Sequence, residues 1–261
     1  MENIKQLRRE DIYYDIPFEE VLTLVKTPNF FHSRINDGEF TAIRSLRNPM
    51  NVNGMNSDFS NYFYPLAVDL MRVLLEYEPT PNYLLSSGSG DYNFGNFLPM
   101  FEEAHMKNPK LKLNQGYFYY DLLMHPPFFE DFHEFLRQKK IVIIGPSYMR
   151  ELRLFDKFEL IEVPRINAYL TMDETIKKIL EYSATGEQIN YCFASGVMTC
   201  IIFHRLVKID KQNSYFNIGS VWDYFFQSNK YDGEPYRITH RGIYPRLVAE
   251  LNRYYEKYII A

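Results

Sequence analysis

Two carboxylates on either side of a glycine, with an arginine shortly before them, are the residues of this sequence best suited to chemistry. They are Asp37 and Glu39 around Gly38, and the arginine is Arg34. Carboxylate oxygens are the ligands that hard divalent cations prefer, and such a cation can neutralise a diphosphate leaving group. A guanidinium group can bind phosphate oxygens in a fork. The segment is therefore a candidate metal and phosphate site, on a loop that follows a predicted strand.

Small residues follow most of the β-rich runs of the sequence. Glycine and serine let a backbone approach a ligand closely, and N–H groups at the start of the next helix favour phosphate. A tight strand-to-helix turn needs small residues as well, so a purely structural role stays open for each of them. Together we interpret them as a nucleotide-binding edge made of Arg34, Ser87, Gly88, Gly145, Pro146, Ser147, Ser195, Gly196, Gly219 and Ser220.

None of these turns is a standard phosphate loop. The sequence has no G-x-x-x-x-G-K-[ST], and the run that begins at Gly88 lacks the third glycine of G-x-G-x-x-G because Asn93 occupies that position. A simple NAD-dependent enzyme or a P-loop NTPase is therefore not supported. The Asp-x-Glu pattern alone is not specific either, because Asp232-Gly233-Glu234 repeats it in a polar loop that we interpret as a surface turn.

The elements that must position these residues alternate along the chain. β-rich runs are predicted at 29–35, 83–87, 141–145, 158–163, 189–194 and 215–219, and helices at 59–77, 126–138, 173–182, 196–207 and 244–259. This alternation indicates one α/β domain over residues 1–261, with a Rossmann-like, mostly parallel sheet and helices on both faces. The apolar run Ile141–Ile144 predicts a central strand. Ligands of such folds bind beyond the carboxyl ends of the strands, where the candidate residues lie.

Composition narrows the class of protein. Of 261 residues, 46% are hydrophobic and 17% aromatic, which excludes an intrinsically disordered chain. The net charge of −4 gives no hint of the basic face that a nucleic-acid binder needs. The longest uncharged apolar stretch, 191–203, is too short to span a membrane, and the first residues lack a signal-peptide pattern. We expect a cytoplasmic protein in which Cys192 and Cys200 are buried thiols.

A dense aromatic run, Tyr117 to Tyr120, stands just before Asp121. Tyrosine rings stack on sugar faces and on nucleobases, and they also fill protein cores. We interpret this run as core filling.

Several segments resemble those of GT-D-type glycosyltransferases. The segment from Phe31 to Phe40, which contains Arg34, Asp37, Gly38 and Glu39, resembles the R-x-G-D-G-E-[FL] segment of that family. Later segments resemble it in the same order: Lys140 to Ser147, Ile161 to Tyr169, Asn217 to Asp223, and His240-Arg241-Gly242. Asn36 departs from the pattern, since the family mostly has glycine there. Asparagine tolerates left-handed backbone, so we expect the turn to be kept.

The resemblance implies a metal-dependent glycosyltransferase. It implies a nucleoside-diphosphate sugar as donor, with UDP-sugar as the expected one, and a hydroxyl of a glycan or glycoconjugate as acceptor of the hexose or pentose. It further implies that Asp37 and Glu39 hold a divalent cation, Mn²⁺ or Mg²⁺, and it adds Arg241 to the nucleotide-binding residues.

An inverting transferase also needs a base within reach of the acceptor hydroxyl. Asp91 and Asp223 both follow predicted strands at this edge, and helix capping is the structural alternative for each. Two other functions stay open. One is a metal-dependent nucleotidyl or phosphoryl transferase or hydrolase, and the other is a non-catalytic nucleotide-binding or scaffold protein in which Asp37 and Glu39 are structural.

Overall fold

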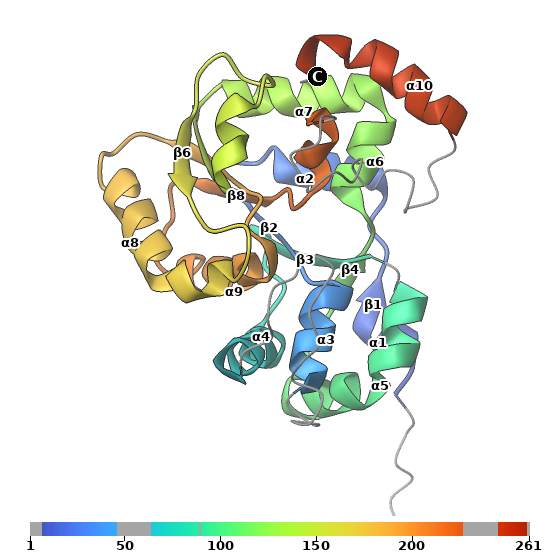
Figure 1. Cartoon of the computed structure of the whole chain (residues 1–261). Coiled ribbons are helices and arrows are strands. Elements are labelled where there is room, and N and C mark those ends of the chain that lie inside the picture. The colour runs from blue at the N-terminus through green and yellow to red at the C-terminus, as the bar shows by residue number, and fades with distance from the viewer. Residues whose placement is uncertain (1–6, 46–63, 89, 227–244, 260–261) are drawn as a thin grey trace, which may run out of the picture.

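The computed structural model describes residues 7–45, 64–88, 90–226 and 245–259 (Figure 1). Within these residues the strands form one eight-stranded sheet in the order β1-β4-β3-β2-β8-β7-β5-β6, and all neighbouring strands run parallel. This confirms the predicted α/β fold. The strands are β1 (Tyr13–Tyr14), β2 (Phe31–Arg34), β3 (Tyr83–Ser87), β4 (Leu113–Gln115), β5 (Lys140–Gly145), β6 (Glu159–Glu162), β7 (Ile189–Phe193) and β8 (Ser214–Asn217).

Helices cover both faces of the sheet (Figure 1). None of the described helices combines the length and the hydrophobicity that crossing a bilayer requires. On one face lie α2 (Phe18–Val25), α6 (Phe118–Met124), α7 (Pro126–Arg137), α10 (Pro245–Tyr254) and the short helices η2 (Ser147–Glu151), η5 (Val221–Phe225) and η7 (Glu256–Tyr258). On the other lie α1 (Arg9–Ile12), α3 (Asp37–Ser45), α4 (Tyr64–Glu76), α5 (Gly90–Lys107), α8 (Met172–Ser183), α9 (Thr199–Leu206), η3 (Ala168–Thr171) and η4 (Gly196–Met198).

The strands are apolar along their length because both of their faces are buried. Successive side chains of a strand point to opposite faces, so one strand feeds two cores. In β7, Tyr191 and Phe193 belong to one core cluster and Cys192 to the other. Cys192 and Cys200 are both buried free thiols, as predicted.

The predicted strands are confirmed as β2, β3, β5, β6, β7 and β8, with small shifts at their ends. The sequence missed β1 and β4, which at 2 and 3 residues are too short to show a periodic pattern. The run Ile141–Ile144 lies in β5 and is buried as expected. It is not central, because β5 is followed in the sheet only by the edge strand β6.

The predicted helices at 126–138, 173–182 and 196–207 correspond to α7, α8 and the pair η4–α9. Those at 59–77 and 244–259 correspond in their described parts to α4 and to α10 with η7. The sequence missed α1, α2, α3, α5 and α6. In α5 a proline, Pro99, lies inside the helix, and Phe97 is non-helical with φ −121° and ψ 18°. Such an interruption hides the helical period of this segment.

His133 of α7 is held neutral by its two hydrogen bonds. Its Nδ1–H donates to the Phe129 carbonyl at 2.7 Å, and its Nε2 accepts from Trp222 Nε1–H at 3.2 Å. This network assigns the proton to Nδ1 and leaves no acceptor for a second one. Burial lowers the pKa of His133 to about 3.

We expect His133 to lower the free energy of unfolding as the pH drops below about 6.5, the ordinary pKa of histidine. Below that pH the unfolded chain binds a proton at His133 that the native state excludes, which costs up to about 1.4 kcal/mol per pH unit. Urea unfolding between pH 7.5 and 5.5 measures this slope. The variant His133→Gln should show a smaller slope, and an unchanged slope would contradict a neutral buried His133.

Candidate active site at the carboxyl edge of the sheet

The turns that follow β2, β3, β7 and β8 meet at one edge of the sheet. The backbone N–H of Ile35 donates to the Ser86 carbonyl at 2.9 Å, and that of Gly219 donates to the Phe193 carbonyl at 2.9 Å. β2 and β8 are neighbours in the sheet. β3, which follows β2 in the chain, lies on one side of this pair, and β7, which precedes β8, lies on the other. Such a switch in direction is where open parallel sheets bind ligands.

Arg34, at the end of β2, lies directly on the backbone of Gly219. Gly219 has φ +62°, and a Cβ atom there would collide with Arg34 Nη2. The guanidinium carbon also lies 5.9 Å from the centre of the Tyr119 ring. Arg34 Nε is buried with no hydrogen-bond partner among the described residues. The positive charge thus lies over peptide and ring atoms, where an anion can approach it.

The Tyr119 ring that lies beside Arg34 is fixed by a buried chain of hydrogen bonds. Its hydroxyl bonds His32 Nδ1 at 2.9 Å, and His32 Nε2 bonds Ser86 Oγ at 2.9 Å. Asn114 Nδ2 donates to the same Ser86 Oγ at 3.2 Å. Burial, and secondarily the Arg34 charge, lowers the pKa of His32 to about 3, so the chain stays uncharged. It supports Arg34 without offering it a counter-ion.

Asp37 and Glu39 lie in the first turn of α3 and not in a loop, which corrects the expectation from the sequence. Residues two apart on a helix do not stack on one face, so the two carboxylates differ in their surroundings. Asp37 is exposed, whereas Glu39 is partly buried and its Oε2 accepts the Asn36 N–H at 2.8 Å. Burial raises the pKa of the Glu39 carboxyl to about 7. The described residues include no cluster of three or more His, Cys, Asp or Glu side chains that could hold a metal.

Asn36 connects the turns after β2 and β3. Its Oδ1 accepts the backbone N–H of Gly88 at 2.9 Å. The only described non-glycine residues with positive φ are Asn29 and Asn167, so the left-handed turn expected at Asn36 is not formed. Asparagine acts here through its amide group and not through its tolerance of left-handed backbone.

The glycines of the predicted nucleotide edge differ in what lies against them. A Cβ atom at Gly88 would meet the Tyr117 ring, and one at Gly145 would meet the Met149 side chain. At Gly219 it would meet Arg34, as described above. Gly196 has φ +66° and an open space where its Cβ atom would be. Three of these glycines therefore make room for side chains, and Gly196 leaves its backbone open.

The serines of this edge are tied to protein partners. Ser195 Oγ bonds Thr199 Oγ1 at 2.8 Å, Ser220 Oγ bonds the Tyr120 hydroxyl at 2.9 Å, and Ser87 Oγ donates to the Gly88 carbonyl at 3.3 Å. Ser147 is exposed at the start of η2, next to the buried Pro146.

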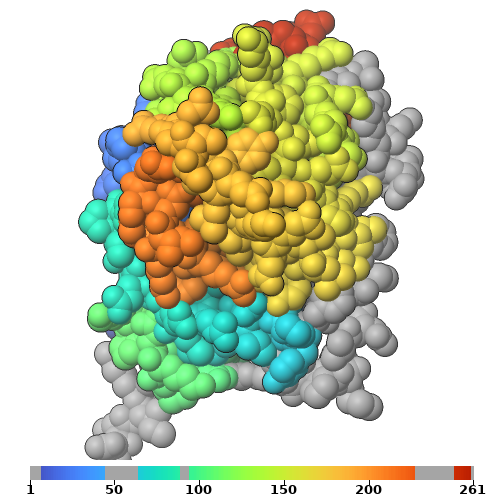
Figure 2. Space-filling model, turned by 90° about the vertical axis from the view of Figure 1, so that its left-hand side faces the viewer, coloured from blue at the N-terminus to red at the C-terminus, as the bar shows by residue number. Residues whose placement is uncertain are grey.

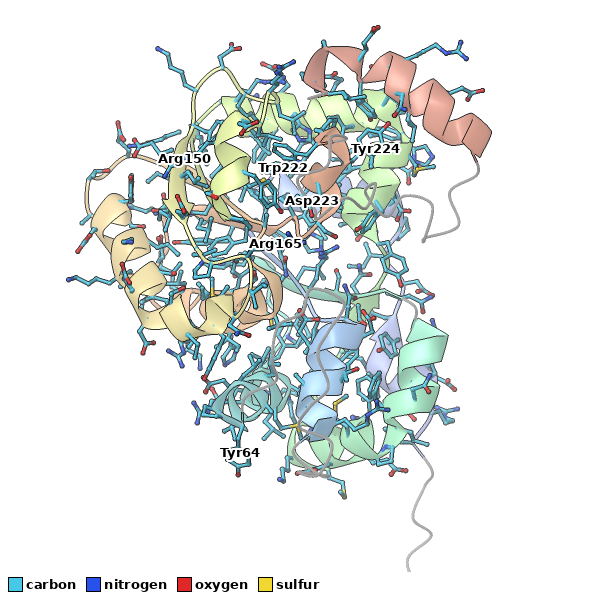
Figure 3. The ribbon with its side chains drawn as sticks, viewed as in Figure 1. Tyr64, Arg150, Arg165, Trp222, Asp223 and Tyr224 are labelled. Atoms are coloured by element: carbon cyan, nitrogen blue, oxygen red, sulfur yellow. The ribbon has the colours of Figure 1, made fainter. Side chains whose placement is uncertain are left out.

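Of the two candidate bases, the structure describes the side chain of Asp223. Asp223 lies in η5 between Trp222 and Tyr224 (Figure 3), is 4% exposed, and accepts a hydrogen bond from the Tyr148 hydroxyl at 2.9 Å. The sequence analysis missed Tyr148, although it directly follows the predicted turn at 145–147. Asp91 belongs to the first turn of α5, and its side chain lies outside the described part. Arg241 and the second Asp-x-Glu copy lie outside the described residues as well.

A cavity of about 290 Å³ lies elsewhere, along the seam where α4 meets α9 (Figure 2). Its cations are already paired: Arg205 with Asp69 at 3.1 Å and Lys208 with Glu76 at 3.1 Å. Arg72 pairs with Asp69 at 3.2 Å. Nothing in this cavity connects it to the candidate residues.

The fold has known counterparts, although no protein-family model and no curated protein matches the chain. A selenomethionine-substituted structure of domain of unknown function 1792 (DUF1792) superposes with a TM-score of 0.59 at 17% identity, over 97% of this chain and 96% of that one. The chain has the DUF1792 fold. A DUF1792 structure described as a new glycosyltransferase from Streptococcus sanguinis gives 0.58 at 16% identity, over 96% and 98%. A further one, described as having a distinct glycosyltransferase fold, gives 0.59 at 17%, over 97% and 96%. These likenesses confirm the predicted fold.

The position of Gly219 against Arg34 can be tested by adding one methyl group. We expect Gly219→Ala to lower the free energy of unfolding more than Gly186→Ala. Both glycines have positive φ, but a Cβ atom at Gly186 would touch nothing within 4 Å. Gly186→Ala should therefore lose only about 1–2 kcal/mol of unfolding free energy to backbone strain, whereas Gly219→Ala must also displace Arg34. Urea unfolding compares them, and equal losses would contradict the contact.

Glu39 offers a second test, because a partly buried carboxylate destabilises the folded state. Its pKa is about 7 in the fold, against about 4.3 in an unfolded chain. Above pH 7 the Glu39 carboxylate is charged in both states, but in the native state it is partly buried and in the unfolded state it is solvated. Its charge therefore lowers the free energy of unfolding. We expect Glu39→Gln, whose amide oxygen can still accept the Asn36 N–H, to be more stable at pH 8 by about 1–3 kcal/mol. The difference should vanish near pH 4.5.

The matched control is Glu20→Gln, since Glu20 occupies the same position in the first turn of α2 and is exposed. It should change the unfolding free energy by only a few tenths of a kcal/mol. If Glu39→Gln were less stable than the wild type at pH 8, Glu39 would be structural.

Proposed function

We propose that the protein is a metal-dependent glycosyltransferase. It would move a hexose or pentose from a nucleoside-diphosphate sugar, with a UDP-sugar as donor, to a hydroxyl of a glycan or glycoconjugate. The observation that carries the proposal is Arg34, held on Gly219 beside the start of α3 and unpaired with any described carboxylate, in a fold shared with structures described as glycosyltransferases.

The diphosphate would lie between Arg34 and two helix starts. α3 begins at Asp37, and η4 begins at Gly196 and continues into α9 at Thr199. The two starts are neighbours, because a Cβ atom at Gly38 would lie 3.7 Å from Val197 Cγ1. Helix N-termini carry partial positive charge and free N–H groups, which favour phosphate. The open backbone at Gly196 lets a phosphate oxygen come close.

Asp37 and Glu39 would hold the divalent cation, Mn²⁺ or Mg²⁺. Their oxygens are the ligands that such cations prefer. Asp37 is exposed, and Glu39 keeps one oxygen that the Asn36 bond does not use. With no third carboxylate or histidine grouped there among the described side chains, diphosphate oxygens and water would complete the coordination. The cation supplies neutralisation of the diphosphate charge that develops as the sugar leaves.

Asp223 is our candidate base for the acceptor hydroxyl. The Tyr148 hydroxyl donates to Asp223 Oδ1 at 2.9 Å and orients the carboxylate. Asp91 remains the alternative base, and Arg241 a further phosphate ligand.

The first test is thermal unfolding with nucleotides, with and without Mn²⁺. A ligand that binds only the folded state raises stability by RT ln(1 + [L]/Kd), about 2.7 kcal/mol at 100-fold Kd. We expect UDP and UDP-sugars to stabilise the wild type in the presence of Mn²⁺ and not to stabilise Asp37→Ala. Asp173→Ala, which removes an exposed first-turn aspartate of α8, is the control and should behave as the wild type.

The product then identifies the bond that breaks. Release of UDP from a UDP-sugar indicates cleavage at the sugar carbon, as glycosyl transfer requires. Release of UMP and a sugar phosphate would favour the phosphoryl-transfer alternative. Binding without turnover across donors and acceptors would favour a non-catalytic nucleotide-binding protein. The absence of any nucleotide effect would contradict the transferase and favour a scaffold in which Asp37 and Glu39 are structural.

A further inference from the structure

The four aromatic residues at 117–120 differ in burial, and the fold gives the inner two and the outer two different surroundings. Phe118 and Tyr119 are buried in the core, as predicted for the whole run. Tyr117 is 36% exposed and Tyr120 is partly buried. The two outer tyrosines therefore remain within reach of a ligand, at the carboxyl edge where β4 leads into α6.

The Tyr117 ring lies against the turn that follows β3. A Cβ atom at Gly88 would overlap the Tyr117 ring atoms, so the ring covers the glycine backbone directly. The Gly88 N–H is in turn held by Asn36 Oδ1 at 2.9 Å. Asn36 is the residue before Asp37. The ring is thus positioned relative to the start of α3, where the phosphate groups would bind.

Tyr120 holds the ring from the other side. The two tyrosine rings meet edge to face, with centres 6.3 Å apart and an angle of 80°. The Tyr120 hydroxyl bonds Ser220 Oγ at 2.9 Å, in the turn after β8. Because β3, β2 and β8 are adjacent in the sheet, the start of α6 reaches across the turn that carries Arg34 and Asn36. Figure 1 shows α6 beside the carboxyl side of β3 and β4.

We propose that Tyr117, backed by Gly88 and held by Tyr120, is the surface on which the nucleobase of the nucleotide stacks. The inference rests on the proposed function, since it places the base of the same ligand whose phosphates Arg34 and α3 would bind. Tyr117 lies against the Gly88 backbone and is still 36% exposed, so part of its ring surface remains accessible to a ligand. Such a ring offers its face or edge to a flat base, and base–aromatic stacking contributes about 1–3 kcal/mol.

The test compares probes that share the phosphate but differ in the base. Calorimetric titration with UMP, with ribose 5-phosphate and with pyrophosphate, each with Mn²⁺, separates the contribution of the base from that of the phosphate. We expect Tyr117→Ala to weaken UMP binding by about tenfold, which corresponds to about 1.4 kcal/mol. Its binding of ribose 5-phosphate and pyrophosphate should stay as in the wild type. Tyr117→Phe keeps the ring and should keep the UMP affinity within about twofold.

Tyr64→Ala is the control, since Tyr64 is a 70% exposed tyrosine of α4 that lies far from Asp223 of η5 in Figure 3. Tyr117→Leu fills the space over Gly88 without an aromatic ring and covers the case in which Tyr117→Ala fails to fold. It should lose UMP affinity as the alanine variant does. Unchanged UMP binding in both variants, or an equal loss for all probes, would overturn the stacking role and leave the proposed function intact. A wild type that binds no probe would overturn both.

Discussion

The contact between the Arg34 side chain and the bare backbone of Gly219 is the interaction on which the candidate site depends. Arg34 ends β2, and Gly219 follows β8, the strand beside it. Gly219 is itself held by the Phe193 carbonyl of β7. Three neighbouring strands thus determine where the guanidinium lies. A cation placed on peptide atoms keeps its full charge for an incoming anion, whereas one paired with a carboxylate does not.

The support under this arginine is polar but uncharged. Tyr119, His32, Ser86 and Asn114 form a buried hydrogen-bonded chain, and the low pKa of His32 keeps it neutral. A charged partner in that position would form an ion pair with Arg34 and compete with phosphate. A neutral hydrogen-bonded network instead fixes the geometry without changing the charge of the site.

The same edge also carries a cost in stability. Glu39 is kept where burial raises the pKa of its carboxyl to about 7, although a neutral residue would fit the Asn36 N–H as well. A carboxyl group whose pKa is raised by burial fits the binding role that we propose for Glu39. Strained or destabilised groups of this kind gather at functional sites.

The sequence by itself determined the α/β class, the long buried strands and the edge of the sheet where the candidate residues gather. Strands such as β3 and β5 are readable because burial on both faces leaves a continuous apolar run. Local pattern also located Arg34, Asp37 and Glu39. It did not find β1 or β4, since elements of two or three residues have no period and exist only because a neighbouring strand supplies their hydrogen bonds.

Only the tertiary structure decided which side chain each of the small residues makes room for. The glycines at 88 and 219 look alike in the sequence, yet they lie under Tyr117 and Arg34, which come from other turns, whereas Gly145 lies under Met149 of the following helix η2. In the same way the fold sent Phe118 and Tyr119 into the core and left Tyr117 at the edge. The reason is that sequence pattern reports the local backbone and the average burial. Which side chain occupies a given space depends on strand order, and strand order is set by contacts between residues far apart in the chain.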